Sequence, residues 1–152
     1  MITLGQVIEH IRNRGYMSGL ARDAARIRST GEVFTPYGAV KEYIDKIRSM
    51  RPDIFTDPEK TACDTSAGDG QFLGEILIAK MESNIPFEKA LSTIYGVEYE
   101  QTNVDLCRDR LLCGQEHLRH IVEKNIVCAD ALTYHYEFNG YDPRPPKDRL
   151  FE

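Results

Sequence analysis

The sequence predicts an α/β fold built on a parallel sheet and preceded by N-terminal helices. From residue 60 onward, short apolar stretches alternate with longer segments whose apolar residues recur at helical spacing, which is typical of βαβ units. The chain has 152 residues, of which 41% are hydrophobic and 28% charged, so it is long enough for one core and unlike a disordered chain. We therefore expect one α/β domain.

The N-terminal part contains three helical patterns. Apolar residues recur at helical spacing over 4–11, over 20–27 and over 40–47. Pro36 suits the first turn of the third helix, because proline is common there. Residues 51–60 contain two prolines and are expected to form a connecting loop.

Three strands are predicted after this loop, at 61–65, 92–98 and 125–130. Helical patterns over 73–81 and 104–111 lie between them. Three strands joined by two crossover helices make half of a doubly wound sheet.

The charge is unevenly distributed. Residues 1–30 contain five arginines and two acidic residues, so they carry +3 of a total of −5, and the rest of the chain carries −8. Such a basic helical segment could contact nucleic-acid phosphates, or its arginines could form a solvated helix face.

No metal, disulfide or membrane segment is expected. No apolar run approaches the roughly 20 residues of a membrane-spanning helix, and the N-terminus lacks the apolar region of a signal peptide, so we expect a cytoplasmic protein. The cysteines lack a C-x-x-C pair and are expected to be buried, reduced thiols. His117 and His120 are three residues apart but have no carboxylate pattern beside them. The four cysteines are Cys63, Cys107, Cys113 and Cys128.

The strongest local signal is the segment Asp64-Thr-Ser-Ala-Gly-Asp-Gly70, an acidic strand end followed by a glycine turn into a helix. Glycines let the backbone approach a ligand closely, and a helix N-terminus directs N–H groups toward an anionic group. Asp64 would repel a pyrophosphate but accept hydrogen bonds from an ammonium group. An amino-acid-bearing nucleoside therefore fits this turn better than a dinucleotide does.

Two further carboxylates end the other predicted strands. Glu98 lies where a ribose-binding carboxylate is expected in such folds, and Asp130 could accept a hydrogen bond from an adenine amino group. The alternative is that these acidic residues only cap the following helices.

Four motifs in order resemble the S-adenosylmethionine-dependent N6-adenine DNA methyltransferases of restriction-modification systems and phages. They are GEVFTP at 31–36, DTSAGDGQFL at 64–73, YGVE at 95–98 and CADALTY at 128–134. The resemblance covers residues 28–138 and implies a partial Rossmann-like methyltransferase fold, with strands in the order 3-2-1, whose cofactor is S-adenosyl-L-methionine. It divides the chain into the basic helical segment 1–30, a cofactor-binding domain 31–138 and a Pro-rich tail 139–152.

The resemblance also implies roles for individual residues. Thr35 and Pro36 would lie near the methionine end of the cofactor, Glu98 would bind the ribose, and Asp130 with Ala131 would contact the adenine. The glycine turn would surround the amino-acid moiety. The remaining residues that the resemblance assigns to the cofactor are Phe34, Asp64, Ser66, Ala67, Gly68, Gly70 and Phe72.

The chain departs from this family in lacking its [DNS]-P-P-[YFW] motif. That motif supplies acceptors for the amino group of a flipped base and an aromatic ring that stacks on it. In the tail, Arg144 and Lys147 flank Pro145-Pro146, and neither can replace the acceptor or the ring. We therefore expect no catalytic residue in this chain.

The family places a fourth strand beside strand 1, and without it strand 1 would present an open edge. Self-association, a second polypeptide or the N-terminal helices could cover this edge. The leading hypothesis is a truncated or split adenine-specific DNA methyltransferase domain that is active only when a partner supplies the acceptor half. The alternatives are a catalytically inactive binding or regulatory module of the same fold and, with less support, a generic dinucleotide-binding unit.

Two aromatic features keep two interpretations each. Tyr134, Tyr136 and Phe138 alternate and could form one buried face of an extended segment or a base-stacking platform. Tyr37 could line the pocket or pack at the start of its helix.

Overall fold

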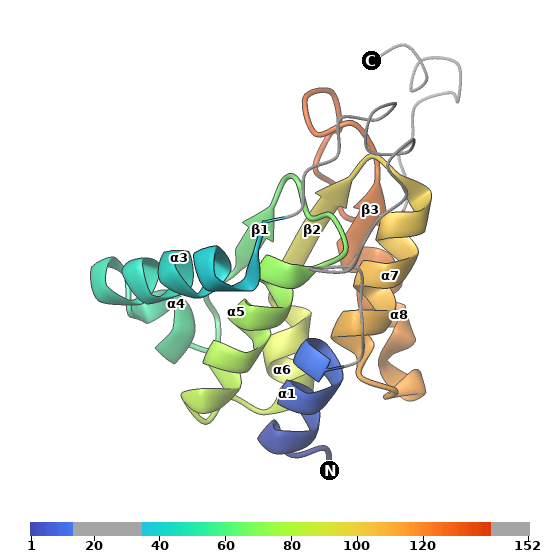
Figure 1. Ribbon diagram of the computed structural model, residues 1–152. Helices are drawn as coiled ribbons and strands as arrows, with labels where there is room; N and C mark the ends of the chain where they lie inside the picture. The colour runs from blue at the N-terminus through green and yellow to red at the C-terminus, as the bar shows by residue number, and fades with distance from the viewer. Residues whose placement is uncertain (14–34, 141–152) are drawn as a thin grey trace.

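Three short parallel strands form the sheet of the computed structural model, which describes residues 1–13 and 35–140. They are β1 (Ala62–Asp64), β2 (Ile94–Glu98) and β3 (Ile126–Cys128), hydrogen-bonded in the order β1-β2-β3. Cys63 lies opposite Tyr95, and Val97 lies opposite Val127. The predicted parallel sheet is confirmed, with strands shorter than expected (Figure 1).

Helices join the strands and cover one face of the sheet. α5 (Gln71–Glu82) and α6 (Phe87–Ser92) lie between β1 and β2. α7 (Gln101–Leu112), a 3-10 turn at Glu116–Leu118 and α8 (Arg119–Asn125) lie between β2 and β3. The predicted helices over 73–81 and 104–111 are confirmed.

The sequence patterns missed α6 and α8. Ser92 and Asn125, which the patterns assign to the starts of strands, are the last residues of these two helices. Both helices are short and end at most one residue before a strand, so their buried residues continue the apolar stretch of that strand. Periodicity alone cannot separate the two.

Three helices precede the sheet among the described residues: α1 (Leu4–Asn13), α3 (Tyr37–Met50) and α4 (Asp53–Thr56). Thr3 and Gln6 form a reciprocal capping box at the start of α1, with N···O distances of 2.9 and 3.2 Å. Pro36 directly precedes α3 rather than lying within its first turn. Residues 51–60 are not simply a loop, because α4 forms there and buries Phe55.

The other predictions for the N-terminal segment and the tail lie outside the described residues. They concern the helix over 20–27, most of the basic segment 1–30, and residues 141–152 of the Pro-rich tail. Within the described ranges, no helix is both long and apolar enough to cross a membrane.

The core lies between the sheet and the helices. Gly96 faces α5: a Cβ built there would lie 2.8 Å from Leu73 Cδ1 and 3.0 Å from Ala67 Cβ. Ile94 and Ile126 lie in the same buried cluster. This close approach explains why a glycine stands in the middle of β2.

The opposite face of β2 and β3 is covered by the chain that continues from β3. Val97 and Val127 are fully buried in a cluster that includes Tyr134 and Phe138. The expectation of an extended segment with one buried face is wrong, since residues 134–138 form no strand and Tyr136 and Phe138 have φ of 55° and 48°. Tyr134 is buried, whereas Tyr136 is 40% exposed.

The edge of β1 away from β2 has no strand beside it in the described part of the chain. Cys63, at the centre of β1, is exposed, and Cys128 is only half-buried, so the expectation that all four thiols are buried is wrong for these two residues. Unpaired backbone groups at such an edge can pair with another strand.

Replacing Gly96 by alanine tests the packing of α5 on the sheet. We expect Gly96→Ala to lower the free energy of unfolding by about 1–3 kcal/mol, because the new methyl group would overlap Leu73 and Ala67. Urea unfolding measures the change. Gly38→Ala is the control, because nothing lies within 4 Å of a Cβ at Gly38. Equal stability of the two variants would contradict this packing.

Candidate functional site

A cavity of about 530 Å³ lies at the carboxyl ends of the strands. Of the residues predicted to bind a cofactor, four line it: Ser66 after β1, Glu98 at the end of β2, and Asp130 with Ala131 after β3. Carboxyl ends of parallel strands are the usual place for a ligand in open α/β sheets. The full lining is Thr65, Ser66, Glu98, Tyr99, Ala129, Asp130, Ala131 and Leu132.

The glycine turn between β1 and α5 packs tightly against α7. Gly68 and Gly70 have φ of 54° and 89°, in the region that favours glycine. A Cβ at Gly70 would lie 2.8 Å from Cys107 Sγ. The Ala67 N–H donates to the Val97 carbonyl at 3.0 Å, which joins the turn to β2. Ala67 is itself a buried core residue.

Glu98 holds the turn through its carboxylate. The Gly68 N–H donates to Oε2 at 2.8 Å, and the Glu100 N–H donates to Oε1 at 3.0 Å. Asn103 Nδ2 lies 3.5 Å from Oε1. A carboxylate offers about four acceptor positions. In this arrangement Glu98 therefore has room for one ligand hydroxyl, and a second hydroxyl would compete with the Gly68 N–H.

A buried ion pair anchors the turn to α7. The sequence patterns did not predict this pair. Asp69 Oδ1 lies 3.3 Å from Arg110 Nη1, and the two side chains are only 2% and 3% exposed. Arg110 lies on the buried side of α7 with Val104, Cys107 and Leu111. The sequence feature that could have revealed this pair is an arginine on the apolar face of a predicted helix, because a buried charge needs a partner.

Asp64 lies at the end of β1, next to the cavity residue Thr65 and half-buried. Burial raises the pKa of its carboxyl, and the nearby charge of Glu98 raises this pKa further. The Ser66 N–H, which donates to Oδ1 at 2.9 Å, acts in the opposite direction. The ionised form of Asp64 is therefore disfavoured in the folded protein.

Asp130 is partly engaged by its own backbone. The Leu132 N–H donates to Oδ1 at 2.8 Å, and the carbonyl of Asp130 accepts from Thr133 and Tyr134. The carboxylate thus caps a turn, but no helix follows this turn among the described residues, so the alternative that Asp130 only caps a following helix is wrong. The side chain of Asp130 also lines the cavity.

Thr35, Pro36 and Phe72 do not line the cavity. Thr35 and Pro36 precede α3, whose N-terminal end lies beside that of α5 in Figure 1. The ring of Phe72 packs against Tyr43 of α3, with centroids 6.0 Å apart. Phe34 lies outside the described residues.

Two apolar side chains at the cavity were not predicted from the sequence. Tyr99 follows Glu98 and is 49% exposed, and Leu132 follows Ala131 and is 93% exposed. Such side chains can pack against the faces of a planar base. The sequence feature that could have revealed them is that each directly follows a residue predicted to bind the cofactor.

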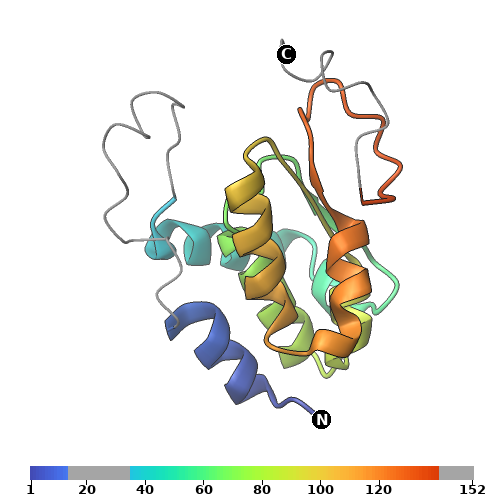
Figure 2. The ribbon, with the colours of Figure 1, turned by 90° about the vertical axis from the view of Figure 1, so that its right-hand side faces the viewer.

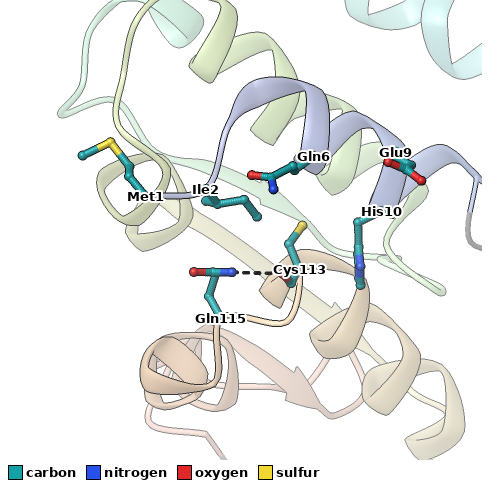
Figure 3. A pocket seen from close by; sticks show the side chains of 7 residues that line it. All are labelled: Met1, Ile2, Gln6, Glu9, His10, Cys113 and Gln115. Carbon is teal, nitrogen blue, oxygen red and sulfur yellow. Dashed lines mark hydrogen bonds between the residues drawn. The ribbon is translucent and has the colours of Figure 1, made fainter.

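A second cavity, of about 450 Å³, lies between α1 and the end of α7 (Figure 3). It contains none of the predicted cofactor residues and no strand end. Its lining is Met1, Ile2, Gln6, Glu9, His10, Cys113 and Gln115. Among the residues that the structure describes, no group of three or more His, Cys, Asp or Glu side chains could hold a metal ion.

Replacing Asp64 by asparagine tests the cost of its charge. Because the pKa of Asp64 is raised in the folded protein, ionisation destabilises the fold as the pH rises through this pKa. We expect Asp64→Asn to unfold at a higher temperature than the wild type at pH 7, and the advantage to disappear below about pH 4, where Asp64 becomes protonated in both states. Thermal unfolding between about pH 3 and pH 8, a range chosen to span carboxyl titration, measures this. A difference independent of pH would contradict it.

Comparisons of the chain with protein-family models, with curated proteins and with solved structures found no match. The chain is therefore not assigned to a family. The support for a function comes from the cavity, which is lined by residues from three adjacent strand ends.

Proposed function

We propose that this chain is an S-adenosylmethionine-binding domain of the adenine-specific DNA methyltransferase type, and that it takes part in methyl transfer to adenine N6 only when a partner supplies the acceptor site. The observation that carries the proposal is that Ser66, Glu98 and Asp130, from three strand ends, line one cavity. They do so beside a glycine turn that opens α5.

The chemistry of these groups suits the parts of the cofactor. Asp64 would accept hydrogen bonds from the α-ammonium group, and Glu98 would accept one from a ribose hydroxyl. Asp130 would accept from the adenine amino group, and Tyr99 with Leu132 would flank the ring. Backbone N–H groups at the start of α5 would face the carboxylate of the ligand.

The electrostatics favour a ligand that carries positive charge. Asp64 and Glu98 are close enough for the charge of Glu98 to raise the pKa of Asp64. An ammonium or sulfonium group would relieve this repulsion, whereas a pyrophosphate would add to it. This supports S-adenosylmethionine over a dinucleotide.

DNA binding through the N-terminal segment is part of the proposal. Of its five arginines only Arg12 is described, and it pairs with Glu75 of α5. Arg14, Arg22, Arg26 and Arg28 lie outside the described residues.

A catalytically inactive binding module is a second candidate. The observation that favours it is the edge of β1 with the exposed Cys63, which has no strand beside it among residues 1–13 and 35–140, since such an edge can pair with a strand of another chain or of a second copy. Incubation of the chain with labelled S-adenosylmethionine and adenine-containing DNA tests the second candidate, because methyl transfer would exclude an inactive module. Transfer by this chain alone would also contradict the need for a partner.

Calorimetric titration with S-adenosylmethionine and S-adenosylhomocysteine tests the proposed site. We expect binding of one ligand per chain, and weakening by about 1–3 kcal/mol in Asp64→Ala and in Glu98→Gln, because each change leaves a ligand donor without its charged acceptor. Glu98→Gln retains an oxygen that can accept from the Gly68 N–H, so the turn keeps its anchor.

Asp105→Ala is the matched control, because it removes an exposed carboxylate from α7 without touching the cavity. We expect its affinity to equal that of the wild type. Absence of binding to the folded wild type at millimolar ligand would overturn the proposal. Tight binding of NAD in its place would favour the generic dinucleotide-binding unit.

A further inference from the structure

Arg12, the penultimate residue of α1, links two other helices. Its Nε and Nη2 atoms donate to the two carboxylate oxygens of Glu75 in α5, at 2.9 and 2.7 Å. The Glu75 side chain is only 7% exposed, so its charge depends on this partner. The pair is bidentate and partly buried, and it differs in this from the exposed ion pair of α3 between Lys41 and Asp45.

The same guanidinium lies over the ring of Tyr37, with Cζ 5.4 Å from the ring centroid. Tyr37 is the first residue of α3 and directly follows Pro36. A guanidinium over an aromatic face is attracted to the ring electrons. One side chain of α1 therefore contacts both α5 and the start of α3.

The helix that carries Arg12 is itself firmly placed. Val7 and Ile11 are buried, and Ile11 packs so closely on α5 that a Cβ at Gly74 would lie 2.7 Å from Ile11 Cγ2. His10 points from α1 toward the end of α7 in Figure 3, where Nε2 lies 3.1 Å from the Asp109 carbonyl oxygen. α1 packs against α5 and α7 and lies at the lower edge of the molecule in both ribbon views (Figures 1 and 2).

The first turn of α3 is closed by two backbone hydrogen bonds, and the helix packs against the start of α5. The Pro36 carbonyl accepts from the Ala39 and Val40 amides at 3.0 and 3.1 Å, and these bonds form the first turn. Tyr43 of α3 packs against Phe72, in the first turn of α5, directly after the glycine turn. Tyr43 is the seventh residue of α3, so it is the placement of this helix as a whole that bears on the position of the turn that borders the cavity.

We propose that Arg12 is a positioning residue for the cofactor site: it holds the first turn of α3, and with it Thr35 and Pro36, against the N-terminal end of α5. This inference rests on the proposed function for the identity of the ligand. Arg12 does not line the cavity and acts through Glu75 and Tyr37. Lysine would not serve equally, because it cannot bind a carboxylate with two parallel donors and stack on a ring at once.

Amide hydrogen exchange tests the ligand-free part of the inference. We expect Arg12→Ala and Arg12→Lys to accelerate exchange at the Ala39 and Val40 amides, by about tenfold for the alanine variant. The Val104 amide is the internal reference, because Val104, like Val40, is fully buried and donates to the residue before its helix, at 3.0 Å. Faster exchange at Val104 to the same extent would mean general destabilisation and would overturn the inference.

Two further variants keep the test decisive if Arg12→Ala does not fold. Tyr37→Leu leaves the pair with Glu75 intact and should reproduce the faster exchange at Ala39 and Val40. Lys41→Ala removes the exposed pair with Asp45 from the same helix and should leave exchange unchanged. Exchange in Tyr37→Leu equal to that of the wild type would overturn the inference.

Titration of the same variants with S-adenosylhomocysteine tests the link to the site. We expect affinity to fall about tenfold in Arg12→Lys and in Tyr37→Leu and to be unchanged in Lys41→Ala. Unchanged affinity together with faster exchange would overturn a role at the site. If the wild type does not bind the ligand, the proposed function fails, and the exchange result alone decides whether Arg12 holds the start of α3.

Discussion

The hydrogen bond from the Gly68 N–H to the Glu98 carboxylate is the interaction on which the candidate site depends. It joins the turn after β1 to the end of β2, and so fixes two of the three strand ends that line the cavity. Beneath it, the buried pair of Asp69 and Arg110 and the contact of Gly70 with Cys107 hold the same turn on α7. The turn is thus organised before any ligand arrives, which lowers the ordering cost of binding.

The same arrangement concentrates negative charge at one edge of the sheet. Backbone amides offset the charge of Glu98, but Asp64 receives one such bond and is held with a raised pKa. Groups whose ionisation works against folding gather at functional sites, because a ligand can supply the missing compensation. The structure has no comparable arrangement of acidic groups around its second cavity, where Glu9 is the one carboxylate among the described lining residues.

Much of the fold could be predicted from the sequence because its strong signals are local. The strand and helix patterns from residue 60 onward predicted the parallel sheet, and the acidic residues after each strand predicted the carboxyl edge at which Ser66, Glu98, Asp130 and Ala131 line one cavity. The features that could not be predicted depend on contacts between distant segments. The pair of Asp69 with Arg110 joins residues 41 positions apart, and the covering of Val97 and Val127 by Tyr134 depends on an irregular backbone with no periodicity to reveal it.

At three glycines of this protein, a side chain from a neighbouring element packs directly on the backbone. Ile11 of α1 lies on Gly74 of α5, Leu73 of α5 lies on Gly96 of β2, and Cys107 of α7 lies on Gly70 of the turn. At these positions even the smallest side chain must displace its neighbour, whereas Gly38 and Gly114 have open space around them. Sequence drift in related chains is therefore expected to be slow at the first three and free at Gly38, so the spacing of the layers would persist long after surface residues and loops have diverged beyond recognition.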